Sequence, residues 1–126
     1  MVEKYQIYKC ELCGNTVGMI FAGGGELVCC GQPMSVQEEK TADQGMEKHV
    51  PVVEESAGTM TIKVGSTEHP MTDDHYIQWI DTIADDAEAR KYLKPGETPS
   101  KQFQKEDGIK KVRAYCNIHG LWKQEV

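Results

Sequence analysis

The sequence contains no uninterrupted apolar run of the ~20 residues that a helix needs to cross a bilayer. The N-terminal stretch MVEKYQIYKC also lacks the apolar core and the small-residue cleavage site of a secretory signal peptide. We therefore expect a cytoplasmic protein with no membrane association. Cysteines in that compartment stay reduced, so the five cysteines are better explained as metal ligands than as disulfides.

Positive charge is also scarce. The 126 residues include 14 lysines and arginines against 20 aspartates and glutamates, which gives a net charge of −6. Non-specific binding to nucleic acid needs a basic surface that displaces counterions, so this composition argues against a nucleic-acid partner. The protein as a whole repels anions, and an anionic substrate would need a local positive focus.

The first segment, residues 1–37, has too few large apolar residues for a core of its own. Segments this short usually need a metal, disulfides or a partner subunit in order to fold. Cys10 and Cys13 form a C-x-x-C pair, and Cys29 and Cys30 supply two more thiolates. Four thiolates predict a tetrahedral site for zinc or a single iron, and spacing alone does not choose between the two metals.

The second cysteine pair constrains the backbone. Side chains of adjacent residues diverge in regular structure. Because Cys29 and Cys30 are adjacent, directing both at one ion requires a bend. We therefore expect a turn at this position.

Beyond residue 48 the pattern is typical of an all-β sandwich or barrel. Short runs with β-branched or aromatic residues, many alternating apolar with polar, are separated by glycine, proline and aspartate turns. We expect the polar run 38–48 to be a linker or exposed loop, and DDAEARKYL at 85–93 to be a short helical turn. The predicted strands are PVVEES (51–56), TMTIKVG (59–65), YIQWIDTIA (76–84), KQFQKED (101–107), KKVRAYC (110–116) and LWKQEV (121–126).

A second group of candidate ligands consists of all four histidines and the fifth cysteine: His49, His69, His75, His119 and Cys116. A single histidine in a β domain is more often a surface or hydrogen-bonded residue. Here each histidine is expected in a loop or at a strand edge, where a sandwich can gather residues that are distant in sequence. Cys116 and His119 form a C-x-x-H pair that can bind one ion from a single turn, so the group predicts a shared metal site.

Four imidazoles and one thiolate are one ligand more than a closed structural zinc site uses. Five ligands favour iron with an open position. A thiolate opposite that position donates electron density to whatever binds there. The ligand set therefore suits one-electron chemistry on a small oxygen species, with Cys116 as the axial donor.

Six motifs are specific in combination: KCELCGN, CCGQPM, EKHVP, HPM, HYIQWI and YCNIHG. Together they make the sequence resemble desulfoferrodoxin, the two-iron class of superoxide reductase, over essentially the whole chain. The resemblance implies an all-β homodimer. It places a small desulforedoxin- or rubredoxin-like Fe(Cys)4 domain at residues 1–37. Residues 38–126 would form an immunoglobulin-like, seven-stranded β-sandwich with an Fe(His)4Cys site. Within this second domain, residues 38–48 would be a linker and active-site loop. By matching motif, the first iron takes Cys10, Cys13, Cys29 and Cys30, and the second takes His49, His69, His75 and His119 in a plane with Cys116 on the axis.

The implied activity is the one-electron reduction of superoxide to hydrogen peroxide at the second iron, which detoxifies superoxide in anaerobes. An external donor such as rubredoxin restores the ferrous state. The resemblance also implies that Lys48 attracts superoxide and helps to protonate it, and that Glu47 binds the open position of the resting ferric iron. The charge pattern supports Lys48 independently, because it is a cation beside His49 in an acidic protein. Without the metal, an exposed Glu-Lys pair is simply solvated.

Two other functions stay open: a two-iron electron-transfer protein without a substrate, and a zinc-ribbon-like segment on an immunoglobulin-like binding module without catalysis. One position also departs from the family pattern. Related chains often carry an acidic residue two places before the axial cysteine, where this chain has Ala114. The resemblance therefore does not carry the family's tuning of the iron–sulfur bond to this chain.

Overall fold

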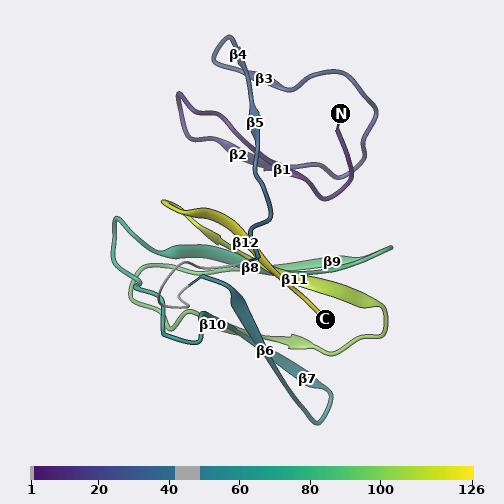
Figure 1. Cartoon of the computed structure of the whole chain (residues 1–126), viewed down its shortest axis with the longest axis vertical. Coiled ribbons are helices and arrows are strands. Elements are labelled where there is room, and N and C mark those ends of the chain that lie inside the picture. The colour runs from purple at the N-terminus through teal and green to yellow at the C-terminus, as the bar shows by residue number, and fades with distance from the viewer. Residues whose placement is uncertain (1, 42–48) are drawn as a thin grey trace. The chain divides into compact units, whose positions relative to one another are not determined.

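The computed structural model describes residues 2–41 and 49–126 (Figure 1). The chain divides into two compact units, Met1–Glu38 and Glu39–Val126. All regular elements in the described ranges are β-strands, which confirms the predicted fold class. None of the described residues belongs to a helix that could span a membrane.

The first unit is built from short strands. A three-stranded antiparallel sheet has the order β2-β1-β5, with β1 at Ile7–Lys9, β2 at Thr16–Gly18 and β5 at Ser35–Val36. A second pair, β3 (Val28–Cys29) and β4 (Gln32–Pro33), forms a hairpin. Several large apolar side chains of this unit remain in solvent, including Ile20 at 83% and Phe21 at 82% exposure. The unit thus has little apolar burial to hold it together.

The hairpin between β3 and β4 contains the bend that adjacent cysteines require. Its two turn residues, Cys30 and Gly31, have φ angles of 54° and 76°. Two successive residues with positive φ are typical of a type I′ turn, the tightest common hairpin connection. The turn directs the Cys30 side chain to the same side as Cys29, and the predicted bend is confirmed.

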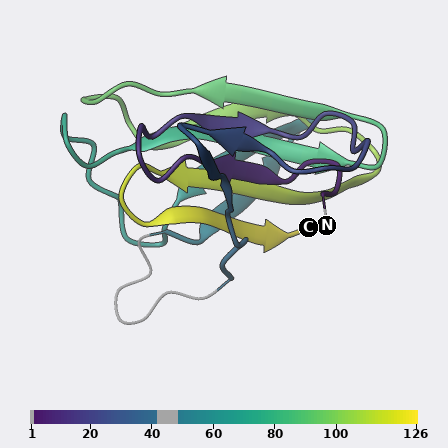
Figure 2. The same cartoon turned by 90° about the horizontal axis from the view of Figure 1, so that it is seen from above.

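The second unit is a β-sandwich of seven antiparallel strands in two layers (Figures 1 and 2). One sheet has the order β10-β7-β6, with β6 at Pro51–Ser56, β7 at Thr59–Val64 and β10 at Ser100–Gln104. The other has the order β12-β11-β8-β9, with β8 at Ile77–Ala84, β9 at Glu88–Tyr92, β11 at Ile109–Cys116 and β12 at Gly120–Glu125. The buried core between them draws on β7, β8, β10 and β11, and includes Met60, Ile62, Ile80, Phe103, Val112 and Ala114.

The six predicted strands are all present, but the helical turn predicted at 85–93 is wrong. Residues Glu88–Tyr92 form β9, which pairs with β8 from Ile83↔Glu88 to Trp79↔Tyr92. Strand β8 is buried along most of its length, so its free edge needs backbone partners. That requirement outweighs a weak helix propensity.

Candidate metal centres

The four cysteine sulfurs of the first unit lie within 4.8 Å of one another. Cys13 Sγ is 3.6 Å from Cys29 Sγ, which in turn is 3.9 Å from Cys30 Sγ. Sulfurs bound to one tetrahedral ion through bonds of about 2.3 Å would be about 3.8 Å apart. The spacing of the thiols therefore fits a single tetrahedral metal ion.

Backbone and side-chain N–H groups surround these sulfurs. The N–H of Cys13 donates to Cys10 Sγ at 3.5 Å, and the N–H of Asn15 donates to Cys13 Sγ at 3.5 Å. The Cys13 N–H lowers the pKa of Cys10 to about 6. Hydrogen bonds with the sulfurs of Cys13 and Cys29 raise the pKa of Cys30 to about 12, because these thiols share protons. A cation would replace the shared protons, as metal binding by thiols requires.

In the second unit, four imidazole rings form a closed square. Ring centroids are 4.7 Å apart for His49 and His69, 4.8 Å for His69 and His75, 5.1 Å for His75 and His119, and 4.8 Å for His119 and His49. Neighbouring ring planes are inclined by 68° to 79°. All four predicted histidines are thus gathered around one centre.

Two nitrogens of this square have no hydrogen-bond partner. Among the described residues, His69 Nε2 and His75 Nε2 are buried and unpaired. His69 Nδ1 lies 2.7 Å from the Pro70 carbonyl oxygen, so Nδ1 carries the proton and Nε2 presents a lone pair. Burial lowers the pKa of His69 to about 4, which keeps the imidazole neutral. Buried lone pairs of this kind fit a bound metal ion.

The Cys116 thiol completes the group. Its sulfur and the ring nitrogens of His49, His75 and His119 lie within 4.8 Å of one another. Cys116 is fully buried. Burial raises the pKa of its thiol, and the N–H groups of His119 and Ile118 oppose this shift because they favour the thiolate. The His119 N–H lies 3.4 Å from the sulfur.

The sequence positions these ligands at the connections of the sandwich. β11 ends at Cys116 and β12 begins at Gly120, so Cys116 and His119 share one tight turn, as predicted. His49 precedes β6, and His69 and His75 lie in the connection between β7 and β8. Ala114, the position that departs from the family pattern, is fully buried in the core.

Two side chains beside the histidine square were not predicted. Trp122 stacks on His49 with centroids 4.7 Å apart, and its indole N–H donates to the His119 carbonyl at 3.2 Å. Lys40 Nζ donates to the same carbonyl at 2.7 Å. Lys40 lies in the run interpreted as a linker, and its contact depends on long-range pairing with β12 that no local pattern reveals. The predicted Glu47 and Lys48 lie outside the described residues.

Known proteins match this chain along its whole length. The family model described as desulfoferrodoxin, N-terminal domain, matches residues 2–36, and the one described as desulfoferrodoxin matches residues 41–125. A desulfoferrodoxin homolog of Archaeoglobus fulgidus is 53% identical over 123 residues, and a desulfoferrodoxin of Syntrophotalea carbinolica is 51% identical over 125 residues. The alignments cover 98% and 99%, respectively, of both chains.

Among solved structures, the superoxide reductase from Treponema pallidum matches with a TM-score of 0.78 and 27% sequence identity. The match covers 95% of this chain and 97% of the other. The similarity therefore extends over both units of the chain.

Proposed function

This chain belongs to the desulfoferrodoxin family, and on that premise we propose that it is a superoxide reductase, which converts superoxide, one electron and two protons into hydrogen peroxide. The observation that carries the proposal is the square of four imidazoles beside the buried Cys116 thiol. A closed structural zinc site uses four ligands, whereas this arrangement offers five.

We assign the metal ligands as follows. The first iron would be held by the thiolates of Cys10, Cys13, Cys29 and Cys30, and the second by the imidazoles of His49, His69, His75 and His119 together with the Cys116 thiolate. Bound there, ferrous iron would supply the electron that superoxide needs. Residues 1–37 would form the domain of the first iron and residues 38–126 the catalytic domain, a division supported by the two compact units.

The protein side chains would hold the second site ready for this reaction. A neutral His69 needs no deprotonation before it binds a metal, because burial keeps its pKa low. Burial raises the pKa of Cys116, and two backbone N–H groups oppose this shift because they favour the thiolate form. We assign to Lys48 the attraction of superoxide and the supply of protons, and to Glu47 the occupation of the resting site.

We further propose a homodimer, a cytoplasmic location and an external electron donor of the rubredoxin type. The homodimer is supported by the apolar surface of the first unit, where Ile20 and Phe21 are largely exposed and a second copy would cover them. The cytoplasmic location is supported by five cysteines that all remain free.

Metal analysis with visible spectra tests the ligand assignment. We expect two irons per chain and strong visible absorption from ferric iron bound to thiolate. A colourless protein that contains zinc would favour the binding module without catalysis. Two irons without any consumption of superoxide would favour the electron-transfer protein.

A variant separates the roles of the two sites. Cys13→Ser should destroy the first site and loosen residues 1–37, while the pre-reduced second iron still reacts with superoxide, because the second unit carries its own ligands. Loss of the fast reaction while the second iron stays bound and ferrous would contradict this division.

A further inference from the structure

Lys40 is fixed to the strand that follows the second site. Its backbone N–H donates to the Leu121 carbonyl at 3.0 Å, and its carbonyl accepts from the Lys123 N–H at 2.8 Å. These bonds form a parallel bridge between Lys40 and Trp122 at the edge of β12. The backbone of Lys40 is therefore hydrogen-bonded to the edge of the sheet, whereas the backbone of a linker would be exposed to solvent.

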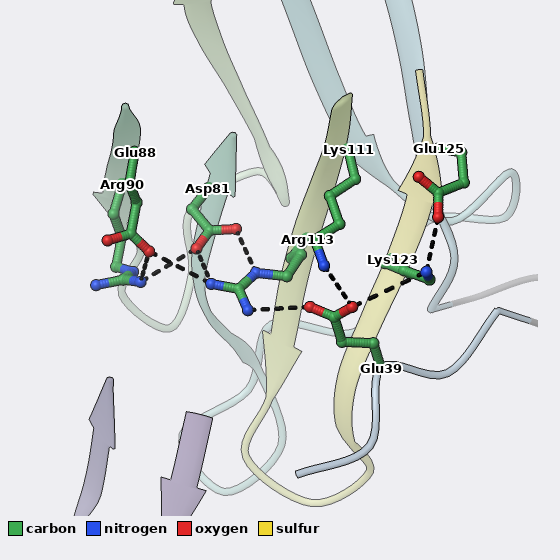
Figure 3. A network of polar contacts seen from close by, with 8 residues as sticks. All are labelled: Glu39, Asp81, Glu88, Arg90, Lys111, Arg113, Lys123 and Glu125. Carbon is green, nitrogen blue, oxygen red and sulfur yellow. Dashed lines mark hydrogen bonds and ion pairs between the residues drawn. The ribbon is translucent and has the colours of Figure 1, made fainter. Parts of the chain in front are cut away.

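The neighbouring residue holds this segment from the other side. The Glu39 carboxylate accepts from Lys111 Nζ at 2.6 Å and from the Arg113 guanidinium at 3.1 Å (Figure 3). Arg113 is fully buried and also pairs with buried Asp81 at 2.8 Å. Side chains of successive residues in extended backbone point in opposite directions. With Glu39 anchored on this network, Lys40 is directed to the other side, where its ammonium reaches the His119 carbonyl.

The His119 carbonyl connects Lys40 to the metal-binding turn. It accepts from both Lys40 Nζ at 2.7 Å and the Trp122 indole at 3.2 Å, and the Lys40 ammonium lies 5.1 Å from the centre of the Trp122 ring. Trp122 in turn stacks on His49. One ammonium group thus contacts the turn of His119 and the ring that supports His49.

We propose that Lys40 is a positioning residue of the second iron site: it fixes the Cys116–His119 turn through the His119 carbonyl and places a positive charge at the turn that carries both ligands. The inference rests on the proposed function, because it requires iron bound by these residues. A nearby cation stabilises the reduced state of the iron and the negative charge on sulfur.

The test compares three variants of the iron-loaded protein. Lys40→Met removes the charge, Lys40→Arg keeps a charged donor, and Lys105→Met removes a lysine paired with Glu55 near the opposite end of β6. The readouts are the midpoint potential of the second iron and the energy of its thiolate-to-iron absorption band.

For Lys40→Met we expect a reduction equilibrium that is less favourable by about threefold to tenfold, where tenfold corresponds to 59 mV for one electron. We also expect the absorption band to shift to longer wavelength. Without the positive charge, the electrons on sulfur are less stabilised, so less energy is needed to transfer one of them to iron. Lys40→Arg should restore most of both properties, and Lys105→Met should leave both at the wild-type values.

Wild-type values in Lys40→Met, or an equal shift in Lys105→Met, would overturn the inference while leaving the proposed function intact. A wild-type protein without the absorption band would instead refute the proposed function. Should Lys40→Met fail to fold, Lys40→Gln gives the same comparison. If Lys40→Met and Lys40→Gln both fail to fold while Lys40→Arg folds, the role of Lys40 is purely structural and the electronic role is overturned.

Discussion

At the scale of single residues, the second site depends on imidazole nitrogens that the protein buries without pairing. Among the described residues, His69 Nε2 and His75 Nε2 have no partner. A buried polar atom without a hydrogen bond costs about 1–3 kcal/mol. A metal ion at this site would remove that cost, so metal binding and the stability of the sandwich should be coupled.

A substitution of His69 tests this coupling. His69→Leu replaces a buried imidazole with an apolar side chain of similar size and removes the unpaired nitrogen. We expect the iron content to fall from two per chain to one, while the metal-free sandwich stays within about 1 kcal/mol of the wild-type free energy of unfolding. Metal analysis and urea unfolding measure the two effects. Retention of two irons would show that His69 is not a ligand.

Cys116 is the residue whose chemistry distinguishes the second site from an all-nitrogen site. Cys116→Ser keeps the size of the side chain but removes the thiolate. We expect loss of the thiolate-to-iron absorption of the second site, and either loss of the metal or a site that no longer turns over. Unchanged spectra and rates would mean that Cys116, although buried beside the histidines, is only a structural thiol.

At the scale of elements, strands with clear alternation could be predicted from the sequence and contacts between distant segments could not. β6, at Pro51–Ser56, coincides with its predicted run. β9 was missed because its residues favour a helix locally and are extended only through pairing with β8. The sequence predicts a linker at Glu39 and Lys40, because charged residues outside a periodic pattern usually lie in solvent. In the structure, Glu39 pairs with buried Arg113, and Lys40 is bound to the edge of β12. The bend at Cys30 was predictable because the chemistry of adjacent ligands requires it.

The contact between Glu39 and β11 predicts a pH-dependent stability. Burial raises the pKa of Glu39, but Lys111 and Arg113 lower it more, so that it lies below its ordinary value of 4.5. A carboxyl group with a lowered pKa stabilises the fold fully above the unfolded value and loses this contribution as the pH falls through the folded value. Glu39→Gln should therefore lower the urea midpoint at pH 7, and the difference from wild type should shrink below about pH 4.5.

Tryptophan fluorescence is a suitable probe for this experiment, because both tryptophans, Trp79 and Trp122, lie in the sandwich. Glu54→Gln is the matched control, since the pair of Glu54 with Lys63 is exposed on both sides and should contribute little. Equal effects of the two substitutions at pH 7 would contradict the special role of Glu39.

At the scale of the whole molecule, the charge of −6 opposes the approach of superoxide, and a local cation must overcome this repulsion. We expect Lys48→Ile to slow bimolecular capture by about tenfold or more. Added salt should slow the wild type, with a Debye length of ~10 Å at 0.1 M, and should slow the variant much less or accelerate it. Stopped-flow or pulse-radiolysis rates at several ionic strengths measure both effects.

Glu47→Ala is the control for this charge effect. Removing a negative charge next to Lys48 should leave capture equal or faster, and it should change the spectrum of the resting ferric protein if this carboxylate binds there. If Lys48→Ile captures superoxide at the wild-type rate with the same dependence on salt, Lys48 is an ordinary solvated lysine.

The products of the reaction distinguish reduction of superoxide by this chain from dismutation. The protein is reduced, freed of excess donor and mixed anaerobically with less than one equivalent of superoxide, and both hydrogen peroxide and dioxygen are measured. The proposed reduction yields one hydrogen peroxide for each superoxide consumed, with one electron withdrawn from the protein each time and no dioxygen. One hydrogen peroxide and one dioxygen for every two superoxide ions, with the protein still reduced, would contradict it.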